Sequence, residues 1–331
     1  MRQGRLFALM ALALCLIVIA SPSLACSSAP KTKTPIKVVM ATYFGSWLNT
    51  YAVSNGLVTS DNVDVTVDLS PSFDDQMMAG NYPVGVMTAT AFAIAADKGI
   101  VGFEAMGIYL ANKGTDDAKG VNIVYTKAGS LLKSPSDLKG KKVGIPGLQS
   151  GAASLFLGML KDEYGIDQSQ MTLVDSPVSQ LITLLAKGDL DAALLNGDPS
   201  VQTFYNSAFQ VLWNVDLAFQ QKYGTYAMST FLVAQADYLK NNRDTVKAVY
   251  DLLKKSSDYG EAHLAELVAK YVELNGGNAD SLQNAYLNHY SVTFDNLEGK
   301  IKDGATTIFG FVKDRGIISN LPDPALVFMK W

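Results

Sequence analysis

Short runs of β-prone residues alternate with helical segments along the first two thirds of the chain. A first cycle has expected strands at 36–42, 63–69 and 84–88 and helices at 47–55, 73–79 and 89–97. A second cycle has expected strands at 141–146, 171–174 and 192–196 and helices at 150–164 and 177–187. Alternation of this kind predicts mainly parallel sheets flanked by helices, with the carboxyl ends of the strands at one edge. Two such cycles predict an α/β protein with two similar lobes.

Two further β-prone segments, 121–127 and 225–235, are interpreted as crossover strands that pair with each other and form a hinge. Amphipathic helices are expected at 243–259, 261–274, 279–289 and 296–315, packed back on the first lobe. The predicted organisation is lobe I at 36–122, lobe II at 123–222 and a second part of lobe I at 223–331. A cleft between hinged lobes, lined by strand ends and helix N-termini, is a site that closes on small ligands.

The segment before the first strand has the features of an export leader. Arg2 and Arg5 precede the apolar run 6–20, which is shorter than the roughly 20 residues of a membrane-spanning helix. We predict a signal peptide at 1–25 and a flexible tether at 26–35. The leader resembles that of bacterial lipoproteins, in which the cysteine is acylated, although Ser23 stands where Leu is usual. Lipidation of Cys26 is the favoured prediction, and ordinary cleavage after Ala25 is the alternative.

Charge and cysteine content exclude several classes of partner and fold. Without Arg2 and Arg5 the chain keeps 27 − 2 = 25 basic residues against 31 acidic ones, a net charge of −6. This balance disfavours nucleic acid and anionic lipid as partners. Cys15 leaves with the leader, so Cys26 has no partner for an internal disulfide. The exported protein is expected on the outer face of the cytoplasmic membrane or in the periplasm, and to touch the membrane through a lipid anchor only.

The residues that usually carry catalysis are sparse. His263 and His289 fall in predicted helices without a neighbouring cysteine, so a metal cluster or a Cys/His pair is not expected. The adjacent pairs Asp74–Asp75 and Asp116–Asp117 are interpreted as solvated turn residues. No nucleophile elbow and no phosphate loop occur in the sequence. We therefore expect no enzyme activity, no cofactor and no metal.

Three motifs carry a family resemblance. They are LKGKKVGIP at 138–146, followed by a Ser/Gly-rich turn, AKGDLDAA at 186–193 and NGL at 55–57. In this order the chain resembles the periplasmic solute-binding proteins of ABC importers for nitrate, sulfonates, taurine and thiamine precursors. The resemblance implies a type II periplasmic-binding fold and a monomer without chemistry of its own. It also implies delivery of a small-molecule solute to a membrane permease with a cytoplasmic ATPase.

The turn at 147–152 is expected to form one wall of the ligand site. Gln149, Ser150, Gly151 and Ala152 place an amide, a hydroxyl and unhindered N–H groups at a helix N-terminus. Such groups suit an oxyanion or an electronegative ring atom, although Ser150 can also serve simply as an N-cap.

Aromatic and small polar residues at other strand ends complete the predicted site. Tyr43 and Trp47 flank a glycine after the first strand, where flat rings can face a ligand or close the core. The resemblance adds Thr88 and Thr90 after the third strand. Asn196 and Asp198 either accept hydrogen bonds from ligand amines or form a turn. Tyr226 is a further candidate near the return crossover.

The ligand is inferred from the charges that the predicted site lacks. Beyond the leader, the only arginines are Arg243 and Arg315, both in predicted outer helices, so no arginine pair for a carboxylate is expected. A sulfonate or taurine-type anion is the favoured ligand. A neutral aromatic heterocycle, such as a thiamine pyrimidine precursor or a flavin, is the alternative. A sensory lipoprotein that binds its solute for a signalling partner is a third possibility.

Overall fold

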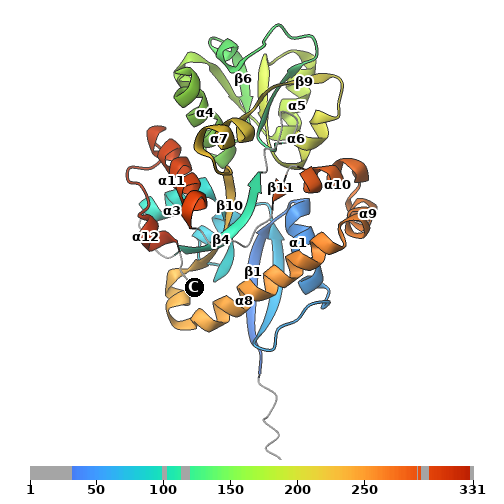
Figure 1. The fold of residues 1–331 in the computed structure, drawn as a ribbon, viewed down its shortest axis with the longest axis vertical. Helices are drawn as coiled ribbons and strands as arrows, with labels where there is room; N and C mark the ends of the chain where they lie inside the picture. Colours follow the sequence, from blue (N-terminus) through green and yellow to red (C-terminus); the bar gives the residue numbers. More distant parts are fainter. Residues whose placement is uncertain (1–31, 99–102, 113–119, 289, 292–297, 329–331) are drawn as a thin grey trace, which may run out of the picture. The chain divides into compact units, whose positions relative to one another are not determined.

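The computed structural model describes residues 32–98, 103–112, 120–288, 290–291 and 298–328. The chain divides into two units, Met1–Thr32 and Lys33–Trp331, and the second unit contains every described helix and strand (Figure 1). The predicted leader and Cys26 lie outside the described residues, as do Asp116, Asp117 and His289.

The first sheet has six strands in the order β11-β4-β10-β3-β1-β2. Its strands are β1 (Thr34–Ala41), β2 (Val63–Ser70), β3 (Val84–Thr88), β4 (Phe103–Asn112), β10 (Met228–Gln235) and β11 (Tyr290–Ser291). Strands β2, β1 and β3 are parallel, in the register Val38 to Val67 and Val38 to Val84. Strand β3 is an apolar run buried in the centre of the sheet, as expected for a strand that is covered on both faces.

The second sheet has five strands in the order β7-β6-β8-β5-β9. Its strands are β5 (Ile123–Lys127), β6 (Lys142–Ile145), β7 (Thr172–Asp175), β8 (Ala192–Leu195) and β9 (Phe209–Asn214). Strands β7, β6 and β8 are parallel and repeat the arrangement of β2, β1 and β3. The two predicted cycles therefore form the parallel cores of two separate sheets.

The two predicted crossover strands do not pair with each other, and that expectation is wrong. Strand β5 pairs antiparallel with β8 and β9 of the second sheet. Strand β10 pairs antiparallel with β3 and β4 of the first sheet. Each segment thus covers the edge that a parallel core would leave open, because an unpaired edge exposes backbone N–H and C=O groups.

Helices follow the strands of both cores. They are α1 (Phe44–Ser54), α2 (Phe73–Met78), α3 (Ala89–Asp97), α4 (Gly151–Tyr164), α5 (Val178–Lys187), α6 (Gly197–Phe204) and α7 (Val215–Tyr223), with short 3-10 helices at Pro135–Leu138 and Gln168–Gln170. Gly85 allows α2 to approach β3, because a Cβ there would lie 2.6 Å from Met77 Sδ and from Val39 Cγ1. Among the described residues, no helix combines the length and the apolar character needed to cross a bilayer.

The C-terminal helices contact elements from the layers of both sheets, and not only those of the first sheet. They are α8 (Ala236–Ala262), α9 (Leu264–Asn275), α10 (Ala279–Asn288), α11 (Gly299–Asp314) and α12 (Pro324–Val327). Helix α8 lies along α1 (Figure 1), as expected, and also contacts β2 and β10. Helix α10, however, contacts α6, and α11 contacts both α3 and α4. The expected packing on the first lobe is thus only part of the arrangement.

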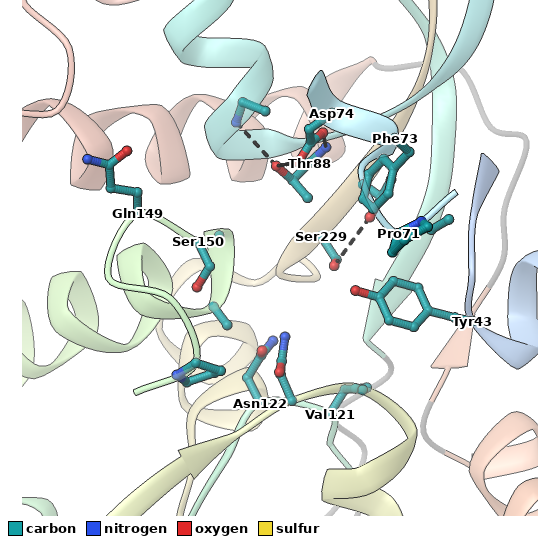
Figure 2. Close-up of a pocket in the computed structure, with 18 of the residues that line it drawn as sticks. Tyr43, Pro71, Phe73, Asp74, Thr88, Val121, Asn122, Gln149, Ser150 and Ser229 are labelled. Atoms are coloured by element: carbon teal, nitrogen blue, oxygen red, sulfur yellow. Dashed lines mark hydrogen bonds between the residues drawn. The ribbon is translucent and has the colours of Figure 1, made fainter. Parts of the chain in front are cut away.

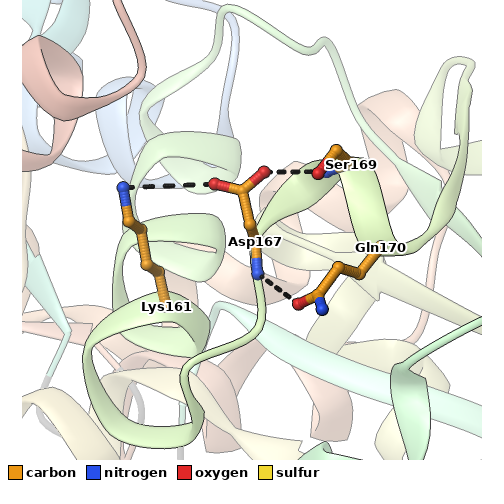
Figure 3. A network of polar contacts seen from close by, with 4 residues as sticks. All are labelled: Lys161, Asp167, Ser169 and Gln170. Carbon is orange, nitrogen blue, oxygen red and sulfur yellow. Dashed lines mark hydrogen bonds and ion pairs between the residues drawn. The ribbon is translucent and has the colours of Figure 1, made fainter.

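The C-terminal end of α4 is followed by a turn with its own hydrogen bonds. At its C-terminus Gly165 adopts a left-handed conformation with φ of 66°. The next turn is closed by Asp167, which accepts from Ser169 N at 3.0 Å and donates its own N–H to Gln170 Oε1 at 3.0 Å (Figure 3). The backbone hydrogen bond from Ser169 lowers the pKa of Asp167, and Lys161 lies 4.0 Å from its carboxylate. The turn therefore defines where α4 ends and where β7 begins.

Candidate ligand-binding site

A cavity of about 670 Å³ lies where the strands of the two parallel cores end. Its wall includes residues from the turn after each core strand, leading into α1, α2, α3, α4, α5 and α6. The helices therefore direct their N-termini, with unpaired N–H groups and positive dipole ends, toward one space. Its volume is within the roughly 300–1,000 Å³ typical of small-molecule pockets. Figure 2 shows side chains from both sheets around it.

Most of the residues proposed from the sequence line this cavity. They are Tyr43, Thr88, Gln149, Ser150, Gly151, Ala152, Asn196 and Asp198. They come from the ends of β1, β3, β6 and β8. The strand–helix alternation thus brings together residues that are up to 155 positions apart, from Tyr43 to Asp198. Further lining residues that the sequence reasoning did not select include Pro71, Phe73, Asp74, Asn122, Pro177 and Ser229.

Three proposed residues are not part of the described cavity wall. Trp47 is half-buried and packs on Tyr271 of α9, with ring centroids 5.2 Å apart, because its position on α1 turns it toward the C-terminal helices. Thr90 is 1% exposed, and its hydroxyl lies 3.4 Å from Ser154 Oγ in the contact between α3 and α4. Tyr226 is 37% exposed in the link between α7 and β10.

Asp74, in the first turn of α2, lines the cavity (Figure 2). Its carboxylate accepts from Thr88 N at 2.8 Å and from Thr88 Oγ1 at 2.9 Å. Burial raises the pKa of Asp74 to about 6, against the effect of the two Thr88 hydrogen bonds and with a smaller contribution from the charge of Asp75. The interpretation of Asp74 as a solvated turn residue is therefore wrong, whereas Asp75 is exposed.

Asn122 reaches the cavity from the segment that leads into β5 and is held there by a buried carboxylate. Asp216, 1% exposed, accepts from Val121 N at 2.6 Å and from Asn122 N at 2.8 Å through Oδ2. Its Oδ1 accepts from Asn122 Nδ2 at 2.8 Å. Asp216 is in the first turn of α7, where Asn214 caps the helix by accepting from Leu217 N at 3.0 Å. These bonds fix the position of the Asn122 side chain.

Asp198 connects the turns after β8 and β1. Its Oδ2 accepts from Phe44 N, the first residue of α1, at 3.3 Å. Restricted solvation, followed by the charges of Asp74 and Asp198, raises the pKa of Tyr43. The Tyr43 hydroxyl is therefore neutral and able to donate a hydrogen bond at physiological pH. Asp198 thus accepts a hydrogen bond from a backbone N–H of another turn. This role differs from both sequence interpretations, a contact with a ligand amine and a local turn.

The N-terminus of α4 carries unpaired N–H groups into the wall. Ser150 caps this helix by accepting from Ala153 N at 3.1 Å. Asp175 receives the N–H groups of Gly147 and Leu148 at 3.0 and 3.2 Å. The N–H groups of Gly151 and Ala152 have no acceptor among the residues that the structure describes. They are available to a ligand.

Arg315 supports this turn from outside the cavity. Its Nη1 donates to Ser154 Oγ at 2.8 Å, and its Nη2 donates to the Leu148 carbonyl. Ser154 Oγ in turn donates to Ser150 O at 3.1 Å. Burial lowers the pKa of Arg315. The guanidinium is therefore engaged in positioning the turn.

The described part of the chain contains no cluster of three or more His, Cys, Asp or Glu side chains that could hold a metal ion. His263 is at the junction of α8 and α9, where its ring stacks on Tyr259 with centroids 4.0 Å apart. Its Nδ1 lies 2.9 Å from the Tyr259 carbonyl oxygen. This histidine has a local structural contact and does not line the cavity.

Comparison with known proteins places the fold and the family. A provisionally named binding protein of Brucella abortus is 25% identical over 307 residues, which cover 89% of this chain and 86% of that protein. The periplasmic aliphatic sulphonate binding protein SsuA from Escherichia coli has a similar structure, with a TM-score of 0.73 at 10% identity, covering 90% of this chain and 93% of that one. The alkanesulfonate-binding protein SsuA from Xanthomonas axonopodis pv. citri, bound to MOPS, gives a TM-score of 0.69 at 14% identity, covering 90% and 98%.

These likenesses confirm the predicted periplasmic-binding fold. The family model described as NMT1/THI5 like matches residues 74–266, which is more than half of the chain. The matched region contains the second parallel core and most of the cavity turns. The chain belongs to the NMT1/THI5-like family.

Proposed function

We propose that this protein is an extracytoplasmic solute-binding protein that captures a small organic solute in the cavity and delivers it to the permease of an ABC importer. The observation that carries the proposal is the convergence of turns from two sheets on one cavity of small-molecule size. The chain passes from the first sheet to the second between β4 and β5 and returns between β9 and β10, and this double connection supports movement of one sheet against the other as on a hinge. Movement about such a hinge would open and close the cavity around a ligand.

An organic sulfonate or taurine-type anion is one candidate ligand. The free N–H groups at the start of α4 support it, because an anion there meets donors and the positive end of a helix dipole. The sulfonate-binding proteins with a similar fold also support it.

A neutral aromatic heterocycle is the second candidate. Tyr43 and Phe73 offer ring faces in the wall, and the wall residues that the structure describes include no arginine and no histidine. The carboxylates of Asp74 and Asp198 would repel a simple anion bound close to them.

A thermal-shift screen followed by calorimetry tests the function. The panel contains ethanesulfonate, taurine, nitrate, 4-amino-5-hydroxymethyl-2-methylpyrimidine and riboflavin. A ligand at 100 times its Kd stabilises the folded state by about 2.7 kcal/mol, which gives a readily measured rise in Tm. Stabilisation by a panel member supports the proposal. No bound solute, either from this panel or from a complex mixture of small molecules, would contradict it.

Delivery and location need separate measurements. Stimulation of the ATPase of a reconstituted permease by the loaded protein would support transport, and its absence would favour the sensory alternative. Cys26→Ala is expected to move the protein from the membrane fraction to the soluble exported fraction, because the acyl group would have no attachment site. Retention of the variant in the membrane at the wild-type level would contradict lipid anchoring through this residue.

A further inference from the structure

The orientation of the Asn122 side chain follows from its buried partner. The Asp216 carboxylate can only accept hydrogen bonds when ionised, so the amide nitrogen of Asn122 must face it, at 2.8 Å. The Asn122 Oδ1 atom then points away from Asp216. Asn122 is 7% exposed and belongs to the cavity wall, and its Oδ1 accepts no hydrogen bond from the residues that the structure describes. The cavity thus has a fixed acceptor at this position.

Asp74 presents a second acceptor on the opposite side of the cavity (Figure 2). An ionised carboxylate has about four lone-pair sites, and Thr88 N and Thr88 Oγ1 use two of them. No basic side chain of the described residues lies within ion-pair distance of Asp74. Lys98 is the only basic residue of the described wall, and it is ten residues from Thr88, about 15 Å along α3. Asp74 therefore has no counter-ion among the residues that the structure describes.

Ser46 adds a polar group without a partner. It is 1% exposed, it belongs to the cavity wall, and its Oγ makes no hydrogen bond with the described residues. A hydroxyl left in this state is unfavourable unless a bound molecule or water satisfies it. The wall thus offers two fixed acceptors, and the buried Ser46 hydroxyl belongs to the same wall without a described partner.

We propose that the solute carries amino or protonated nitrogen, and that the Asp74 carboxylate and Asn122 Oδ1, on opposite sides of the cavity, each receive an N–H group from the solute. The inference rests on the proposed function and specifies its ligand class. It applies to either candidate skeleton, since the nitrogen can belong to a charged amine or to an amino-substituted ring. A solute without an N–H group would leave both acceptors unpaired in a closed cavity, which disfavours its binding.

Capture from a mixture tests the inference without choosing the ligand in advance. Dialysed wild-type protein, Asp74→Asn and the control Asp64→Asn are incubated with the dialysable small molecules of yeast extract, and bound compounds are identified by mass spectrometry. Asp64 is exposed on β2 outside the described wall, so its variant makes the same chemical change away from the cavity. Circular dichroism checks that each variant is folded.

We expect wild type and Asp64→Asn to enrich one compound with an N–H group, and Asp74→Asn to bind it about 10- to 100-fold more weakly. An enriched compound without an N–H group, or equal capture by Asp74→Asn, overturns the inference and leaves the proposed function intact. No enriched compound with any protein contradicts the proposed function itself.

A second measurement needs no variant. Calorimetry compares the affinity of the wild type for the captured compound with that for an analogue in which methyl groups replace the N–H hydrogens. A loss of about 10- to 100-fold is expected, because the analogue cannot donate to either acceptor. Equal affinities would overturn the inference.

Discussion

Replacing Asp74 by Asn should change the way stability depends on pH. The pKa of Asp74 rises from its ordinary value of 3.8 to about 6 in the folded protein, with burial as the main cause. Between these values the folded state holds a proton that the unfolded state releases, so wild-type stability falls as pH rises. At about 1.4 kcal/mol for each pH unit, the difference corresponds to about 3 kcal/mol. This contribution is present in full below pH 4 and is lost as the pH passes 6.

Asp74→Asn lacks this titration but can keep contacts with Thr88 through its amide. The free energy of unfolding of the variant minus that of wild type should therefore increase by about 3 kcal/mol between pH 4 and pH 7. Urea denaturation at pH 4, 5, 6 and 7 measures the difference, with Asp64→Asn as the control. The other titratable residues of the described wall are Tyr43, Asp75, Lys98 and Asp198, and they are present in both proteins. A difference that is constant across this range would refute the reasoning.

Two further predictions concern the parts that support the cavity. Asp216→Asn should lower the affinity for a ligand with an N–H group about tenfold, because the Asn122 amide must turn its nitrogen into the cavity to pair with the new side chain. Calorimetry on the folded variant measures the affinity. An unchanged affinity would count against the assigned orientation of the Asn122 amide. Gly158→Ala should lower the free energy of unfolding by roughly 1–2 kcal/mol in urea denaturation, since the new Cβ would lie 2.2 Å from Phe311 Cγ. Gly310→Ala is the comparison, because a Cβ at this position of α11 meets open space. It should raise the free energy of unfolding by up to about 1 kcal/mol.

The parallel cores could be predicted because each of their elements carries its own local signal. The run at 84–88 and the helix at 89–97 agree with β3 and α3 to the residue. The antiparallel partners could not be assigned in this way. Segments 121–127 and 225–235 are both β-prone, but which edge each one covers is decided by contacts between distant parts of the chain. Local propensity contains no information on that choice.

The candidate site shows the same division between local and distant causes. Ser150 was recognisable because a Ser before a helix is a common N-cap, and it caps α4 as that pattern indicates. Asp74 was missed because its burial depends on Thr88, fourteen residues away on the next strand. The available signal was its place in the first turn after β2. Trp47 was chosen as one of the aromatic residues expected in the turn after the first strand. It lies inside α1, where α9 offers it an aromatic partner, a contact between distant parts of the chain.

The carboxylates of the cavity accept hydrogen bonds from backbone N–H groups at helix N-termini, which are the groups that an anionic ligand would use. Asp198 receives the first N–H of α1, and Asp74 receives the N–H of the residue that caps α3. Each of these two helix N-termini thus already has a carboxylate of the protein beside it, whereas the Gly151 and Ala152 N–H groups of α4 have no described acceptor. A solute that is only an anion is attracted by such free N–H groups and is repelled by the carboxylates of Asp74 and Asp198. A solute with an N–H group can use the acceptors as well, so the distribution of carboxylates itself favours ligands that carry nitrogen.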